Sequence, residues 1–173
     1  INYIENIINE NQDEFRSFGE YELYIFDNLD EMHKKIIDKD QEYGLCRMIA
    51  GYAWEWKSQK NPDQYDIVIG ESKLKWNSEP KDWINSQNAI KEVGCIHTTQ
   101  GYDINYAGVI LGNEIVYRDN KIQIVKEKYY DKNGKKTVTD ENELKKYIIN
   151  IYKTILTRGI RGTYIYICDE ELR

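Results

Sequence analysis

Short apolar runs and longer amphipathic stretches alternate along this chain, a pattern typical of strands and helices that pack in layers. Two of the runs, residues 93–96 and 108–111, carry no charge and lie beside glycines, as expected of strands covered on both faces of a parallel sheet. The loop between them, residues 97–103, holds a His, two Thr, a Gln, a Gly and an Asp. We expect this polar loop at the carboxyl edge of the sheet, where α/β proteins bind ligands. A plain polar turn with Gly101 at positive φ is the alternative.

Helical spacing is clearest over residues 140–158, near the carboxyl terminus. The apolar positions follow the i, i+3, i+4, i+7 rule without a break: Leu144, Tyr147, Ile148, Ile151, Tyr152 and Ile155. Asp140 and Glu143 have the spacing of a capping box, and Gly159 marks the expected end of the helix. These features predict one amphipathic helix with a buried stripe.

Weaker signals predict the other elements. In chain order they are a short helix at 1–10, a strand at 20–26, a helix at 28–38 capped by Asn28 and Glu31, a strand at 44–51, a hairpin at 65–76, a helical segment at 82–92, a hairpin at 114–125 and a closing strand at 164–168. Together they predict one α/β domain that occupies all of residues 1–173.

Arg47 interrupts the apolar run at 44–51. An unpaired charge inside a core strand is too costly to persist, so we expect a buried ion pair or a position at the end of the strand. A phosphate contact from the edge of the sheet is the alternative.

Aromatic side chains and lysines are concentrated in residues 52–83, which include all four tryptophans of the chain: Trp54, Trp56, Trp76 and Trp83. Stacking surfaces beside cations suit single-stranded nucleic acid. A small secondary core beneath the first hairpin requires the same side chains, and we favour that interpretation.

Two sequence patterns suggest ligands but lack the necessary residues. Asp66, Glu71 and Lys73 resemble the Asp…Glu-x-Lys set with which some nucleases bind Mg²⁺, but we expect the two acids on exposed tips of a tight turn, and predict no metal site. The stretch 134–137 (GKKT) has the end of a phosphate-binding loop, but Tyr129 stands where its first glycine is required. No complete G-x-x-x-x-G-K-[ST] motif occurs in the sequence.

Two segments carry a family resemblance. IHTTQGYD (residues 96–103) and ILTRGIRGTYIYI (155–167) resemble the fifth and sixth motifs of superfamily one helicases, which lie on the second RecA-like domain of the motor. The wider pattern, which includes GLCRMIAGYAWEW at 44–56, resembles the Schlafen group 3-like DNA/RNA helicase domain family of bacteria from about residue 21 to the end. The resemblance implies a RecA-like domain of the P-loop NTPase type, with a mostly parallel sheet, helices on both faces and inserted hairpins.

The resemblance also implies roles for individual residues. Arg158 matches the catalytic arginine that reaches the γ-phosphate of ATP, although Gly159 stands where the family usually has Ala. The residues that match nucleotide contacts are Gln100, Gly101, Asp103 and Thr157, with Asp103 in place of the usual Glu. The residues that match contacts to the nucleic-acid backbone are His97, Thr98 and Thr99.

Composition restricts the choice of function. The net charge of −6 disfavours a free-standing nucleic-acid binder, but is compatible with one domain of a larger motor. The three cysteines form no C-x-x-C pair, as expected of free thiols in the cytoplasm, and no stretch is long and apolar enough for a membrane span. Because the chain begins with Ile1 and lacks a phosphate loop, we expect a fragment of a longer protein.

The sequence therefore predicts the second motor domain of an ATP-dependent DNA or RNA helicase or translocase, inactive by itself. ATP and Mg²⁺ would be bound mainly by an amino-terminal RecA-like domain of the same chain, and a DNA or RNA single strand would bind weakly to this part. The alternative is a RecA-like domain without catalytic activity that binds a protein partner.

Overall fold

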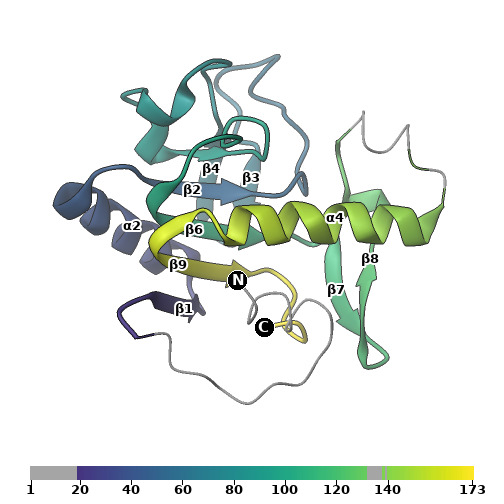
Figure 1. Ribbon diagram of the computed structural model, residues 1–173. Helices are drawn as coiled ribbons and strands as arrows, with labels where there is room; N and C mark the ends of the chain where they lie inside the picture. The colour runs from purple at the N-terminus through teal and green to yellow at the C-terminus, as the bar shows by residue number, and fades with distance from the viewer. Residues whose placement is uncertain (1–18, 132–137, 139) are drawn as a thin grey trace.

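A computed structural model describes residues 19–131, 138 and 140–173 (Figure 1). Its main sheet has seven strands in the order β1-β9-β6-β2-β5-β4-β3. Their bounds are β1 Glu22–Phe26, β2 Cys46–Ala50, β3 Ile67–Ile69, β4 Ser72–Trp76, β5 Glu92–Gly94, β6 Ile104–Leu111 and β9 Gly159–Ile167. All neighbouring pairs are parallel except β3 with β4, so the sheet is mostly parallel, as predicted.

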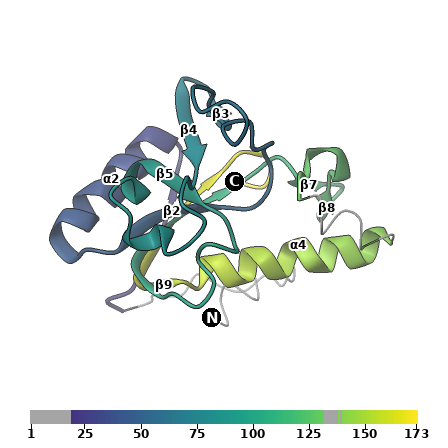
Figure 2. The same cartoon turned by 90° about the horizontal axis from the view of Figure 1, so that it is seen from above.

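Two α-helices cover the sheet, one on each face (Figure 2). Helix α2 (Leu29–Tyr43) packs on the face that carries Met48 and Ile110. Helix α4 (Glu141–Leu156) packs on the opposite face with Ile49 and Val109. Because side chains alternate along β2 and β6, each strand contributes to both cores, and this explains why these runs contain so few polar residues.

Residues 82–92 form less regular helix than the sequence suggested. Residues 82–92 hold only two 3-10 turns, η1 (Trp83–Asn85) and η2 (Ala89–Lys91), where we expected one helical segment. The third such turn is η3 (Lys126–Lys128). The helix expected at 1–10 lies outside the described residues. Within the described part of the chain, no helix has both the length and the apolar character that crossing a bilayer requires.

Side chains cap the starts of both long helices. The Asn28 side chain accepts a hydrogen bond from the Glu31 amide at 3.0 Å, which confirms the first half of the expected capping box. Asp140 caps α4, but its carboxyl accepts from the Asn142 amide at 3.3 Å and not from that of Glu143. Helix α2 runs five residues beyond its predicted end, and stops where Gly44 adopts a φ of 68°.

Both expected hairpins are present. Strands β3 and β4 form the first, and β7 (Ile115–Arg118) and β8 (Lys121–Ile124) form the second as a separate two-stranded sheet. Asp119 and Asn120 at its turn have φ values of 54° and 60°, the conformation of a type I′ turn. Figure 1 shows this second hairpin beside the amino-terminal half of α4.

The aromatic segment divides between core and surface. Trp76 and Trp83 are each 1% exposed, so they belong to the interior, as the favoured interpretation required. Trp54 and Trp56 are only partly buried, and their rings lie 6.4 and 6.2 Å from that of Trp76. The segment is therefore a secondary core with two tryptophans at its surface.

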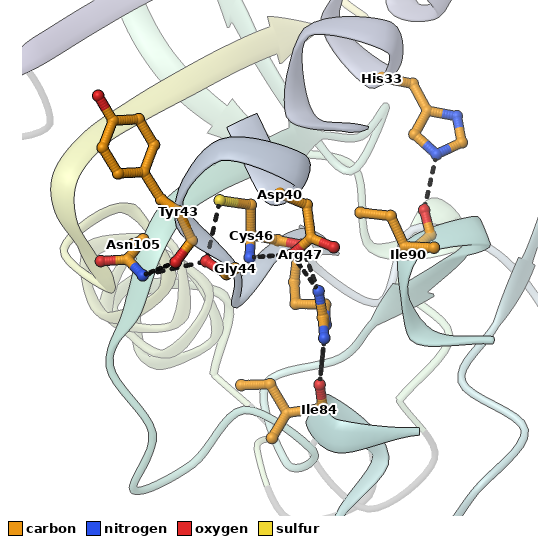
Figure 3. A network of polar contacts seen from close by, with 9 residues as sticks. All are labelled: His33, Asp40, Tyr43, Gly44, Cys46, Arg47, Ile84, Ile90 and Asn105. Carbon is orange, nitrogen blue, oxygen red and sulfur yellow. Dashed lines mark hydrogen bonds and ion pairs between the residues drawn. The ribbon is translucent and has the colours of Figure 1, made fainter. Parts of the chain in front are cut away.

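Arg47 forms the buried ion pair that its position in a strand predicted (Figure 3). Its Nη1 lies 2.8 Å from Asp40 Oδ1 and 2.7 Å from the Cys46 carbonyl. Its Nε and Nη2 donate to the Ile84 carbonyl at 2.9 and 2.6 Å. Each guanidinium nitrogen therefore has a partner, and the fold uses four of the five N–H groups.

Candidate functional site

The loop after β5 runs from the carboxyl edge of the sheet, where β5 ends, to the amino edge, where β6 begins. Gly94 at the end of β5 is aligned through Ile49 of β2 with Val109, near the end of β6. Because β6 is parallel to β5, the chain must return to the opposite edge to begin β6, where Ile104 is aligned with Gly159. The expectation of a carboxyl-edge loop is therefore right for its first residues and wrong for its last.

Asp103 and Arg158 meet at the amino edge of the sheet. Arg158 Nη1 lies 3.7 Å from Asp103 Oδ1, and the Ile104 amide donates to the Arg158 carbonyl at 3.0 Å. The Arg158 side chain is 21% exposed and that of Asp103 is 69% exposed. Arg158 Nε is buried and has no hydrogen-bond partner among the described residues. The backbone of Arg158 is therefore held by the fold, and among the described residues its guanidinium makes only the 3.7 Å contact with Asp103.

The other predicted nucleotide contacts lie close by in sequence but differ in exposure and bonding. Gln100 and Gly101 are exposed, and Gly101 has a φ of 84°, as the simple turn interpretation predicted. Thr157 caps the end of α4, because its hydroxyl donates to the Lys153 and Thr154 carbonyls, at 3.0 Å each. That Gln100, Gly101 and Thr157 contact a nucleotide stays a prediction.

The predicted nucleic-acid contacts lie at the other end of the loop. His97 is exposed, and its ring lies 5.9 Å from that of Tyr52, just beyond the end of β2. Thr98 Oγ1 accepts from the Cys95 amide at 3.0 Å and lies 3.4 Å from Asn77 Oδ1. Thr99 is 1% exposed, and its hydroxyl donates to the Cys95 and Ile96 carbonyls. Of the three residues, His97 and Thr98 are therefore the ones that a ligand can reach.

A charged cluster stabilises the amino ends of β1 and β6. Glu22 Oε1 accepts from Lys39 at 2.7 Å and from Tyr106 at 2.8 Å, and the Tyr164 hydroxyl donates to Oε2. Burial alone would raise the pKa of Glu22, but these hydrogen bonds outweigh it and lower the pKa to about 2. Because its partners come from α2, β6 and β9, the carboxylate ties three elements to the edge strand β1.

A buried acid near the carboxyl ends of β2 and β6 escaped the sequence analysis. Glu114 is fully buried, Oε1 accepts from the Tyr152 hydroxyl, and Oε2 has no partner among the described residues. Burial raises its pKa to about 7, against which the hydrogen bond from Tyr152 acts only partly. An acid directly after the Gly112-Asn113 turn resembles an exposed loop residue, so its sequence context gives no sign of burial.

The described residues include no group of three or more His, Cys, Asp or Glu side chains that could bind a metal ion. Asp66 is nevertheless buried, at 3% exposed, and not on an exposed tip as expected. Its carboxylate accepts from the Ser58 amide and hydroxyl and from the Trp76 amide, at 2.6–2.9 Å. It therefore anchors residues 57–58 to the hairpin, a structural use of the acid.

Comparison with known proteins assigns this chain to a family of helicase domains. The chain belongs to the family described as Schlafen group 3, DNA/RNA helicase domain, whose sequence model matches residues 1–169.

A relative in Saccharomyces cerevisiae, Uncharacterized protein YPL245W, is 36% identical over 164 residues, 88% of this chain and 36% of that protein. The chain thus spans about a third of the length of this relative, and similar sequences are not confined to bacteria. The crystal structure of the C-terminal domain of a possible DNA helicase from Lactobacillus plantarum WCFS1 covers 96% of this chain and 84% of its own, with 11% identity and a TM-score of 0.35. A similarity this low carries no argument.

Proposed function

We propose that this chain is the second motor domain of an ATP-dependent DNA or RNA helicase or translocase. In this proposal Arg158 contacts the γ-phosphate, Asp103 and its neighbours contact the nucleotide, and His97 and Thr98 contact the backbone of a single strand. The domain is RecA-like in this proposal, and the mostly parallel sheet with one α-helix on each face supports that assignment. Membership of the helicase-domain family supports the class of reaction.

The observation that carries the proposal is the proximity of Asp103 and Arg158. The sequence analysis assigned these two residues to nucleotide contact from separate motifs, and their side chains lie 3.7 Å apart at one edge of the sheet. A guanidinium with unused donors suits two phosphate oxygens, and it stays charged at any working pH. A carboxylate beside it suits the hydroxyls of a ribose.

In this proposal, the chain supplies one half of an ATP site. No phosphate loop occurs in the sequence, so the loop that binds the β- and γ-phosphates and the ligands for Mg²⁺ must come from another domain. When one domain completes the site of another, hydrolysis is coupled to their relative motion. The amino-terminal RecA-like domain expected from the family resemblance is the partner that the proposal requires.

Replacement of Arg158 tests the proposal in a protein that carries both domains. Arg158→Ala should reduce nucleic-acid-stimulated ATP hydrolysis by about 10³–10⁵-fold, as loss of an arginine finger does. Arg158→Lys should restore little, because an ammonium cannot bind two oxygens in the same geometry. Arg161→Ala is the matched control, since Arg161 is an exposed arginine of β9, three residues after Arg158, and lies over the Tyr43 ring. Normal hydrolysis by folded Arg158→Ala would refute the proposal.

A non-catalytic module that binds a protein partner is the second candidate. The edge strand β1 exposes Tyr24 (60%) and Ile25 (48%), and Ile160 is 63% exposed. An open strand edge with apolar side chains can pair with a strand of a partner. The gene sequence before residue 1 separates the candidates: a strand, G-x-x-x-x-G-K-[ST] and a helix there support the motor, and their absence supports the module.

A further inference from the structure

A cavity of about 530 Å³ lies at the carboxyl end of β4, outside the ATP-facing edge described above. Trp56 and Trp76 form its aromatic lining, and Asn77, Ser78, Lys75 and Glu92 contribute polar side chains. Its volume is within the range of about 300–1,000 Å³ that is usual for small-molecule sites. None of the site residues predicted from the sequence motifs lines this cavity.

Two polar side chains of the cavity, Asn77 and Glu92, are buried and make few hydrogen bonds. Glu92 is 9% exposed, and only its Oε2 accepts hydrogen bonds from the described residues, from Trp83 Nε1 at 2.8 Å and the Ser78 amide at 2.9 Å. Trp76 Nε1 is buried and has no partner among the same residues. Asn77 is 2% exposed, and its Nδ2 makes one long contact, 3.5 Å to the Glu79 carbonyl. Since buried polar groups are normally satisfied, this set is arranged for a ligand with both donors and acceptors.

The cavity adjoins the predicted strand contacts. Thr98 Oγ1 lies 3.4 Å from Asn77 Oδ1, so the residue expected to contact the nucleic-acid backbone lies against a side chain of the cavity. A strand whose phosphate or sugar lies at Thr98 therefore has a base within reach of Trp56. Unpaired bases are commonly stacked on an aromatic ring and hydrogen-bonded along the Watson–Crick edge.

We propose that this cavity binds a guanine base of single-stranded nucleic acid, an inference that rests on the proposed function. Among the bases, guanine alone offers two adjacent N–H donors, N1–H and the 2-amino group, next to a carbonyl acceptor. Glu92 Oε1 has two lone pairs for the donors, and the side-chain N–H of Asn77 suits the O6 acceptor. Trp56 supplies the stacking surface.

Binding of labelled 15-mers tests the proposal. The probes are dT15 and the same strand with a central dG, dA, dC or deoxyinosine, measured by fluorescence anisotropy at low and moderate salt. We expect the dG strand to bind about tenfold more tightly than the dA and dC strands. Deoxyinosine, which lacks the 2-amino group, should lose most of this gain. Equal affinity for all central bases would overturn the proposal.

Matched variants locate the site. Trp56→Ala should weaken binding of the dG strand about tenfold or more, as loss of a stacking partner does, while Trp54→Ala should not. The two side chains are alike in burial and in distance from Trp76. Glu92→Gln should remove the preference for dG and leave binding of dT15 unchanged, because Gln replaces an acceptor with a donor. Equal losses from Trp56→Ala and Trp54→Ala would overturn the assignment to this cavity, provided that thermal midpoints show both variants folded.

Two further measurements separate this inference from the proposed function. If dT15 binds with strong salt dependence but the central base has no effect, the strand contacts stand and the guanine site fails. If guanosine monophosphate quenches tryptophan fluorescence in the wild type but not in Trp56→Ala, and no strand binds, the cavity takes a free nucleotide and the strand contacts fail. If neither probe binds, both fail.

Discussion

Arg47 and Arg158 are two arginines near the amino edge of one sheet, each beside an aspartate. Arg47 lies 2.8 Å from Asp40, with its side chain 9% exposed and every guanidinium nitrogen bonded. Arg158 lies 3.7 Å from Asp103, with its side chain 21% exposed and Nε unpaired among the described residues. Before the structure, a phosphate contact was an open interpretation for both.

The difference separates a cation whose donors are used by the fold from one whose side chain makes a single long ion pair. Bonds to Ile84 and Cys46 carbonyls use the directions in which the Arg47 guanidinium could approach a phosphate. Arg158 is attached through its backbone, by the bond from the Ile104 amide, so its side chain is not required for that contact. The two arginines therefore differ in how far the fold uses their donors, although each lies beside an aspartate.

Arg47→Met should cause the largest loss of stability. The change leaves Asp40 without its cation and the Ile84 carbonyl without two donors, and breaking a buried pair in this way costs about 3–5 kcal/mol. Urea denaturation measures the free energy of unfolding, with Arg161→Met as a control because Arg161 is exposed. A loss no larger than that of the control would mean that the buried pair contributes little to the fold.

Glu114→Gln extends the comparison to carboxyl groups, because Glu114 has an unpaired oxygen and Glu22 has none. Burial raises the pKa of Glu114 from 4.5 to about 7 in the folded chain, so its contribution to stability is fully present below pH 4.5 and is lost as pH rises through 7. The stability of Glu114→Gln relative to the wild type should therefore increase by up to about 3 kcal/mol between pH 4.5 and 8. Thermal or urea unfolding across this range measures it.

A stability difference between Glu114→Gln and the wild type that stays constant over this pH range would contradict the prediction. It would show that Glu114 ionises as readily in the folded chain as in the unfolded chain.

Arg158→Ala should have the smallest effect on stability, although it has the largest expected effect on ATP hydrolysis. Its ion pair is long and its partner is 69% exposed, and such pairs contribute about 0–1 kcal/mol. The urea midpoint should stay close to that of the wild type. A loss comparable to that of Arg47→Met would make Arg158 a structural residue and remove the contrast between the two.

Local patterns predicted the local structure well. The stripe of α4, the Asn28 cap and the Asp119-Asn120 turn each depend on residues a few positions apart, and all three are confirmed except for one residue of the stripe. Tyr147, expected to be buried with the stripe, is 37% exposed. The ion pair of Arg47 was also predictable, because the cost of a buried charge applies in any fold. The spacing of residues in the sequence could not predict that Asp103 and Arg158 lie close together, since only the pairing of β6 with β9 brings them together.

The errors come from contacts between distant segments. An apolar run shows that a strand is buried but not at which edge the following loop ends, so the amino-edge position of Asp103 was missed. Asp66 was expected on an exposed tip because its partners, Ser58 and the Trp76 amide, are eight and ten residues away. Glu92 was missed for the same reason, since Trp83 and Ser78 surround it only after the sheet has formed.

The pairing of β1 with β9 has a consequence for folding during synthesis. Glu22 is aligned with Gly162, and every parallel partner of β1 lies at the opposite end of the sequence. At ~5–20 residues per second, a ribosome needs roughly 7–28 seconds to make the 140 residues between these two positions. Until then, Tyr24 and Ile25 belong to an unpaired strand open to aggregation, and pairing over such long sequence separations is intrinsically slow. We therefore expect newly made chains to depend on chaperones until β9 leaves the ribosome.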